Sequence, residues 1–140
     1  MDLVADGLVN KEIARALCLS ELTVKQHLVR ISMRFGVGDR AGMVGCLYLK
    51  GWFRRREPGS DARVPQVTPR QYEVLVGVAR GLSNTEIGDR LGISTDTVKT
   101  HVALLLKRFG GRNRAHLVRL AVDAGVLRLV PASMSGGDRG

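Results

Sequence analysis

The sequence contains few of the residue patterns from which catalytic and metal sites are built. Its 140 residues include only two cysteines, Cys18 and Cys46, with no CxxC pair and no Cys/His cluster, which argues against a zinc site and a disulfide framework. Ser, His and acidic residues follow no catalytic order, and no glycine-rich phosphate loop is present. We therefore expect neither an enzyme nor a bound cofactor or metal. Both cysteines are expected to be small buried side chains in a reducing compartment.

Long apolar segments are also missing. No uncharged apolar run approaches the roughly 20 residues that span a bilayer, and no basic-then-apolar leader opens the chain. We expect a cytoplasmic protein with no membrane partner, associated with the nucleoid if it binds DNA.

Acidic residues are scarce relative to basic ones. The chain has 13 Asp and Glu against 22 Lys and Arg, and its formal net charge is +9. Of the 22 basic residues, 17 are arginine, which binds phosphate in a bidentate manner. This excess predicts a polyanionic partner, with nucleic acid ahead of a membrane surface. The net charge alone leaves an alternative open, namely that the basic residues only keep the protein soluble.

The chain contains an internal repeat. Residues 4–44 align with residues 78–118 at a constant offset of 74 without a gap, and 19 of the 41 positions are identical. Self-similarity at a fixed offset indicates a duplicated structural unit. We predict an all-α fold of two tandem four-helix units, the first truncated at its N-terminus. The predicted boundaries are 1–53 for the first, degenerate unit, 54–67 for a linker, 68–125 for the second, complete unit, and 126–140 for a tail.

A helix-turn-helix pattern lies in the middle of each copy. In the second copy a short predicted helix, Asn84–Leu91, precedes a tight turn and a longer helix that Ser94 caps and that ends at Phe109. In this arrangement the second helix lies in the major groove of DNA and the first crosses the phosphate backbone.

The longer helix has two distinct faces. Residues at helical spacing form an apolar stripe, which consists of Val98, Val102, Leu105 and Phe109. The opposite face offers long cations, a hydroxyl and a small side chain, a surface that can enter a groove. It consists of Lys99, Thr100, Ala103 and Lys107.

Two further helices complete the second copy. Thr68, Pro69 and Gln71 form a strong helix start, and this helix is predicted to run to about Arg80. Asn113 is predicted to cap the fourth helix. The side chains expected to face the core are Tyr72, Leu75, Val76 and Ala79 in the opening helix and Leu117, Leu120 and Ala121 in the last one.

The first copy is incomplete. Met1 aligns with Leu75, so the counterpart of Thr68–Val74 is missing. Three explanations stay open: the reading frame begins further upstream, the chain is a fragment, or another segment or subunit covers the exposed core. For the last case, the apolar tail at residues 126–130 is a candidate cover.

Two substitutions weaken the first copy further. Val9 stands where the second copy has the capping Ser83, and Cys18 stands where it has Gly92 at the turn. If that turn needs a positive φ, a non-glycine residue there costs about 1 kcal/mol.

The linker is long enough for both units to bind one DNA site. Its 14 residues, 54–67, span roughly 20 Å as a flexible coil and up to about 46 Å when extended. Adjacent major grooves on one face of DNA are about 34 Å apart. The basic run Arg54-Arg55-Arg56 is expected to be solvated, and Trp52 and Phe53 are expected to close the first core.

The motifs resemble those of a known family. The second copy over its whole length, and the first copy from its second helix onward, resemble the DNA-binding domain of LuxR/FixJ/GerE-type bacterial transcription regulators. Gln71 departs from the glutamate that this family usually has there. The matching motifs are Thr68-Pro69-Arg70-Gln71-x-Glu73-Val74-Leu75, Gly81-Leu82-Ser83-Asn84-x-Glu86-Ile87 and Ser94-x-x-Thr97-Val98-Lys99-x-His101.

This resemblance implies that the third helix reads the major groove and that the fourth often forms a dimer interface. Carried over by motif, Lys99 and Thr100, with Lys25 and Gln26 in the first copy, would meet base edges. Lysine can donate to guanine O6 and N7, glutamine can pair with adenine, and small apolar side chains can touch thymine methyls. Ala103 and Val29 would make the thymine contacts. Residues implied near phosphates are Thr97, Thr23, His101, His27, Lys107, Arg108 and Arg114; for the two histidines a packing role is an equal alternative.

Two functions follow as hypotheses. The first is a sequence-specific regulator of transcription that binds double-stranded DNA through two recognition helices, as a pseudo-symmetric monomer or as a homodimer through the fourth helices. The second is a protein-interaction adaptor, in which the first unit, with exposed Val29 and Met33, docks RNA polymerase or a sister subunit. In that case the second unit alone, or neither unit, binds DNA.

Overall fold

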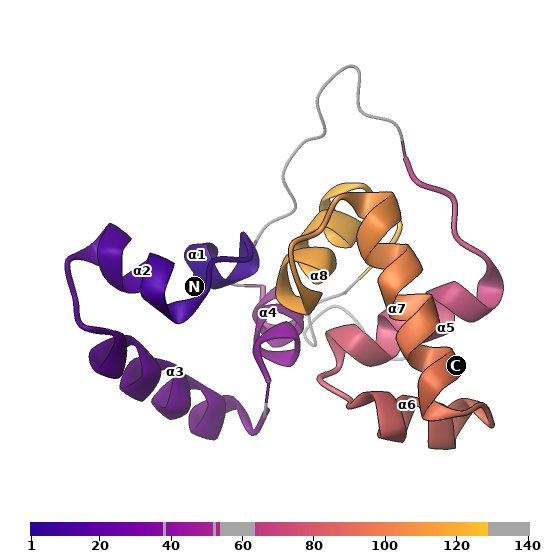
Figure 1. The fold of residues 1–140 in the computed structure, drawn as a ribbon, viewed down its shortest axis with the longest axis horizontal. Helices are drawn as coiled ribbons and strands as arrows, with labels where there is room; N and C mark the ends of the chain where they lie inside the picture. Colours follow the sequence, from indigo (N-terminus) through magenta and orange to yellow (C-terminus); the bar gives the residue numbers. More distant parts are fainter. Residues whose placement is uncertain (38, 52, 54–63, 129–140) are drawn as a thin grey trace.

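The computed structural model describes residues 1–37, 39–51, 53 and 64–128. These residues form eight α-helices and no strand (Figure 1), so the predicted all-α class is confirmed. The helices are α1 (Asp2–Ala5), α2 (Asn10–Leu17), α3 (Glu21–Phe35), α4 (Arg40–Leu49), α5 (Pro69–Ala79), α6 (Asn84–Leu91), α7 (Thr95–Phe109) and α8 (Arg114–Asp123).

The helices follow the repeat in the sequence. We call α1–α4 the first repeat and α5–α8 the second. The bounds of α2, α3 and α4 recur in α6, α7 and α8 with a shift of 74 residues, and α1 corresponds to the C-terminal end of α5. The expected caps are formed: Ser94 accepts from the Thr97 N–H, and Thr68 and Gln71 make a complete capping box.

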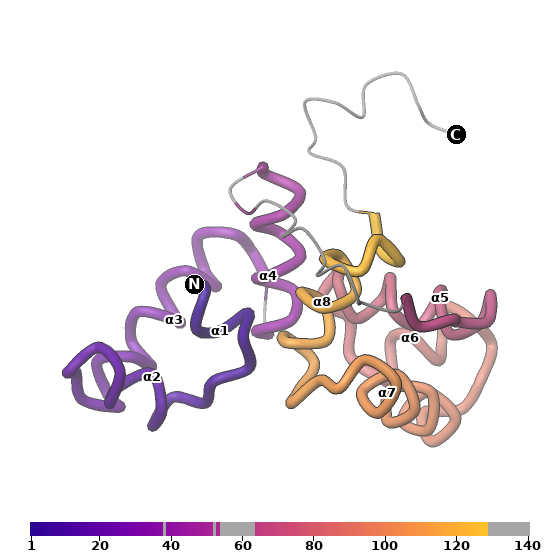
Figure 2. Tube along the Cα trace, turned by 90° about the horizontal axis from the view of Figure 1, so that it is seen from above, coloured from indigo at the N-terminus to yellow at the C-terminus, as the bar shows by residue number. Residues whose placement is uncertain are grey.

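The two repeats meet through their fourth helices. Among the described residues, α4 and α8 contact each other more extensively than any other pair of helices. Figure 2 shows them side by side, with α2 and α3 to one side and α5, α6 and α7 to the other. The opening helices cross over, because α1 packs on both α4 and α8 and α5 packs on both α8 and α4.

Glycines allow this crossing at two equivalent places. Gly7 and Gly81 each lie at the end of an opening helix, and each backbone touches the fourth helix of the other repeat. A Cβ atom on Gly7 would lie 2.9 Å from His116 Cβ, and one on Gly81 would lie 3.2 Å from Gly42 Cα. Since 7 pairs with 81 and 42 pairs with 116 in the repeat, the contact is reciprocal, as in an interface with two-fold symmetry.

A single core runs through both repeats. Side chains of the two fourth helices and of α5 are fully buried in it, including Val44, Leu75, Leu117 and Val118. The four-residue α1 is too short to be stable alone and is ordered by this packing. Leu127 of the tail is also buried in the common core.

One side chain of α5 that was expected to face the core, Tyr72, lies at the surface instead. Tyr72 is 37% exposed and Val76 is half-buried, whereas Val74 and Val78 are fully buried. Val76 packs against the core, and α5 contacts α4 and α8 as well as α6 and α7, so its buried surface is wider than the predicted stripe.

The cysteines also differ from expectation. Cys18 is exposed and Cys46 is half-buried. Cys18 ends α2 with φ +57°, and Gly92 ends α6 with φ +70°. The turn therefore requires a residue in the left-handed conformation, and Cys18 adopts this conformation at an exposed position.

Several predictions fall outside the described residues. These concern Trp52, the greater part of the linker (54–63, with its basic run) and the tail from residue 129 onward. Phe53, which is described, is half-buried and packs edge-on against Tyr48 with ring centroids 5.5 Å apart.

Candidate nucleic-acid interface

The two predicted faces of α7 are separated in the structure. Val98, Val102 and Leu105 are buried, and Phe109 is half-buried against the core. The rest of the helix is open to solvent along its length, and its exposed residues are Asp96, Thr97, Lys99, Thr100, Ala103, Leu104, Lys107 and Arg108.

Helix α3 presents an equivalent but less polar surface. Lys25, Gln26, His27 and Val29 are exposed and Thr23 is half-buried, while Val24 faces the core. Apolar residues replace charged ones at two exposed positions. Leu22, 64% exposed, stands in place of Asp96, and Met33, 77% exposed, stands in place of Lys107.

Both exposed faces border one cleft between the repeats. The cleft has a volume of about 860 Å³ and is lined by equivalent residues of the two repeats. These pairs include Lys25 and Lys99, Val29 and Ala103, Arg40 and Arg114, and Ala41 and Ala115. The exposed faces of α3 and α7 therefore both border this cleft.

The threonine hydroxyls of α7 bond locally. Thr100 Oγ1 donates to the Asp96 carbonyl over 3.1 Å, and Thr97 Oγ1 lies 2.8 Å from Ser94 Oγ. The same pair recurs in α3 as Thr23 and Ser20, also 2.8 Å apart. His101 is half-buried, and its buried Nδ1 has no hydrogen-bond partner among the residues that the structure describes.

Two of the predicted phosphate ligands are engaged within the chain. Arg108 Nη1 donates to the Gln66 carbonyl over 2.6 Å. Arg114 Nη1 donates to Asn84 Oδ1 over 2.7 Å and Nη2 donates to the Leu82 carbonyl over 2.8 Å. Burial lowers the pKa of Arg114.

Arg40, the equivalent residue of the first repeat, is also engaged within the chain. The Arg40 guanidinium donates to the Asn10 side chain, and burial lowers the pKa of Arg40. In each repeat this arginine ties the fourth helix to the first helix of the helix-turn-helix. The identity of both Arg and Asn between the copies is the sequence signal that could have predicted this structural link.

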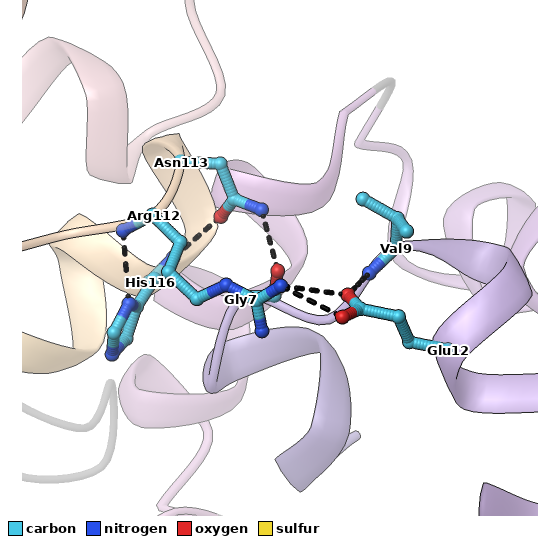
Figure 3. A network of polar contacts seen from close by, with 6 residues as sticks. All are labelled: Gly7, Val9, Glu12, Arg112, Asn113 and His116. Carbon is cyan, nitrogen blue, oxygen red and sulfur yellow. Dashed lines mark hydrogen bonds and ion pairs between the residues drawn. The ribbon is translucent and has the colours of Figure 1, made fainter.

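A polar network joins the repeats beside the cleft (Figure 3). Asn113 Nδ2 donates to the Gly7 carbonyl over 2.9 Å, and Arg112 Nη2 lies 2.8 and 2.9 Å from the two Glu12 oxygens. His116 is half-buried, and its Nδ1 accepts from the Arg112 N–H over 3.1 Å. Sequence analysis missed this network because it connects residues about a hundred positions apart.

Within the described ranges, no cluster of three or more His, Cys, Asp or Glu side chains could hold a metal ion. The helices described are also each too short or too polar to cross a bilayer.

The paired helices, their caps and the exposed face of the second helix in each pair define a helix-turn-helix protein. The family model described as "Bacterial regulatory proteins, luxR family" matches residues 1–46 and 65–121. The chain therefore belongs to the luxR family of bacterial regulatory proteins, which are regulators and not enzymes.

Curated relatives carry names of the same kind. The transcriptional regulatory protein MctR of Rhizobium johnstonii is 40% identical over 76 residues, which is 54% of this chain and 34% of that protein. The transcriptional activator protein ExaE of Pseudomonas putida is 37% identical over 71 residues, 51% of this chain and 33% of the relative. The transcriptional regulatory protein FixJ of Bradyrhizobium diazoefficiens is 36% identical over 66 residues, 47% of this chain and 32% of the relative. The matched part is thus about a third of each relative, and no solved structure matches the chain.

Proposed function

We propose that this protein regulates transcription by binding double-stranded DNA sequence-specifically through two recognition helices, α3 and α7. One observation carries the proposal: the two equivalent helices expose Lys25 and Lys99 on the same side of the molecule, at the border of one cleft. Membership of the luxR family and the names of its relatives support it. We place the two units at residues 1–53 and 68–125.

Each exposed side chain has a role in this proposal. Lys25 and Lys99 donate to guanine, Gln26 pairs with adenine, and Thr100 bonds a base edge. Val29 and Ala103 contact thymine methyls. Residues assigned to the phosphates are Thr23, Thr97, His27, His101, Lys107 and Arg108. Arg114 we assign to holding α8 against α6, because its bonds to Asn84 and Leu82 occupy both terminal nitrogens.

Electrostatics supplies most of the affinity. A protein of net charge +9 that neutralises several phosphates releases the condensed counterions, so its binding constant falls steeply with salt. Lysine and arginine make these contacts without a cofactor.

The contact between the fourth helices supports a monomeric binding unit. In a homodimer through the fourth helices, α4 or α8 would have to face another chain. Here α4 and α8 face each other within one chain, and this leaves the intramolecular pair as the unit that we propose to bind DNA.

The test measures the affinity of the wild-type chain and of single-charge variants for the DNA site that the wild-type chain selects. Fragments retained by the full chain from sheared genomic DNA at physiological salt are sequenced, and the recovered site is used in anisotropy titrations. Lys99→Ala and Lys25→Ala should each weaken binding about 5- to 150-fold, the range for losing one good base contact. Arg80→Ala removes the same charge from the exposed end of α5 and should change affinity less than threefold. If both lysine variants bind like Arg80→Ala, the recognition assignment is wrong.

A second function has one observation in its favour. Helix α3 exposes Leu22, Val29 and Met33, an apolar surface that suits a protein partner such as RNA polymerase. If Lys99→Ala weakens DNA binding while Lys25→Ala has no effect, the first repeat does not read DNA, and the adaptor hypothesis is favoured for it.

A further inference from the structure

We infer that a single chain recognises two inverted half-sites of unequal sequence on one DNA duplex. The inference rests on the proposed function, and it adds the orientation, spacing and asymmetry of the DNA target. A tandem repeat in sequence would suggest a direct repeat in DNA, but the packing of the two repeats points to the opposite orientation.

The orientation follows from the reciprocal contacts between the repeats. If the repeats were related by translation, a surface of one would meet a different surface of the other. Instead α4 meets its own counterpart α8, and each opening helix packs on the fourth helix of the other repeat. The pairs Gly7 with His116 and Gly81 with Gly42 show the same reciprocity at the level of residues.

A two-fold relation in the protein imposes a two-fold relation on its site. Helices α3 and α7 line the same cleft through equivalent residues, of which Lys25 and Lys99 are one pair. When two recognition helices are related by a two-fold axis, their half-sites are inverted and lie one helical turn apart, about 10 base pairs.

Polar contacts across the interface keep the two helices in one relative position. Arg112 Nη2 contacts both oxygens of Glu12, and Asn113 donates to the Gly7 carbonyl, so both bonds cross from the second repeat to the first (Figure 3). The spacing between the half-sites should therefore vary little, whereas two domains on a free linker would accept a wide range of spacings.

The two half-sites differ because the two reading faces differ. Lys25 and Lys99 are the same residue and specify the same base. Gln26, equivalent to Thr100, pairs with adenine in a bidentate manner, which threonine cannot do. Val29, equivalent to Ala103, offers a larger apolar contact for a thymine methyl. The target is therefore an imperfect palindrome.

The first experiment selects bound sequences from a random duplex pool with the full wild-type chain at physiological salt. The expected result is two inverted elements about 10 base pairs apart, which share a guanine contact and differ beside it. Reversing one element into direct orientation should lower affinity by about a hundredfold or more, as several mismatches would. Elements in direct orientation, or one element alone, would overturn the inference and leave the proposed DNA binding intact.

The second experiment exchanges the reading faces. The double variant Gln26→Thr with Val29→Ala gives α3 the residues of α7 at these positions, and it should select a symmetric palindrome of the second half-site. The reciprocal variant, Thr100→Gln with Ala103→Val, should select the palindrome of the first half-site. All four positions are exposed, so these changes should leave the fold intact.

A matched control substitution also makes the two repeats more alike, but at a position outside the cleft. Leu49→Asp introduces the second-repeat residue, equivalent to Asp123, at an exposed position on α4, and the selected sequence should not change. Selection of an unchanged asymmetric site by both double variants would overturn the inference. If the wild-type chain enriches no sequence and Lys99→Ala has no effect on binding, both the proposed function and this inference are wrong.

Discussion

The Arg119 guanidinium binds the Asp2 carboxylate across 117 residues of sequence, with 2.9 Å between Nη2 and Oδ1. Nη1 lies 3.3 Å from the Asp2 carbonyl and 3.4 Å from Asp6 Oδ1. The guanidinium carbon also lies 5.3 Å from the centre of the Phe53 ring. Arg119 is only 5% exposed, so it fixes the first repeat to α8 from inside the interface.

Removing this side chain should loosen the first repeat. Arg119→Ala deletes charge-assisted hydrogen bonds and buried packing, and it should lower the free energy of unfolding by about 2 kcal/mol. The Asp2 side chain is 69% exposed, so Asp2→Asn should cost less than about 1 kcal/mol. Urea unfolding followed by circular dichroism measures both values. Equal losses would show that burial of Arg119 does not matter.

The left-handed turn in the first repeat offers a stabilising substitution. Cys18 has φ +57° and is exposed, so Cys18→Gly should remove backbone strain and raise the free energy of unfolding by about 1 kcal/mol. The reverse change in the second repeat, Gly92→Ala, places a Cβ that meets no atom of the described residues within 4 Å, and it should lower the free energy of unfolding by a similar amount for the same reason. Thermal unfolding of the two variants tests this, and a destabilised Cys18→Gly would contradict it.

The Glu12 carboxylate should make stability depend on pH. Its pKa is lowered from 4.5, first by the hydrogen bond from the Val9 N–H and then by the hydrogen bond from Arg112. A lowered folded-state pKa means that the stabilisation is present above pH 4.5 and is lost as the pH falls through the folded-state value. Glu12→Gln should therefore be less stable than wild type at pH 7 and equally stable at low pH.

This difference is measured by urea unfolding at a series of pH values from 7 downward. Glu86 is a useful comparison, because the groups that lower its pKa, the Ser83 N–H and hydroxyl, belong to its own repeat. Glu86→Gln should show the same dependence but leave the inter-repeat contact intact. A Glu12→Gln difference that grows as the pH falls would contradict the assignment.

Salt should affect the wild-type chain and the lysine variants differently. Each lost phosphate contact reduces the slope of log K against log salt by about one, whereas a lost base contact leaves it nearly unchanged. Lys107→Ala should reduce the slope, and Lys99→Ala should reduce the affinity more than the slope. Anisotropy titrations between low and high salt give both quantities. Identical slopes for all variants would contradict the division of roles.

Local structure was predictable from the sequence because helix ends are marked by single residues. Ser94, Thr68 and Asn113 cap helices where expected, and the apolar spacing in α7 placed Lys99 and Thr100 on the exposed side. Each of these predictions depends on residues a few positions apart, whose interactions the helix geometry determines.

The relation between the repeats was not predictable in this way. Periodicity shows that α4 and α8 are apolar, but not that they cover each other. Arg119 and His116 would ordinarily be assigned to the surface, and their burial depends on residues at the other end of the chain.

The most direct test of the central claim is a hydroxyl-radical footprint of the full chain on its selected site, recorded with the stoichiometry of the same complex. One chain per duplex should protect two segments about one helical turn apart on the same face of the DNA. Protection of a single segment by one chain, or two segments only when two chains are bound, would contradict the claim that one chain carries both reading helices.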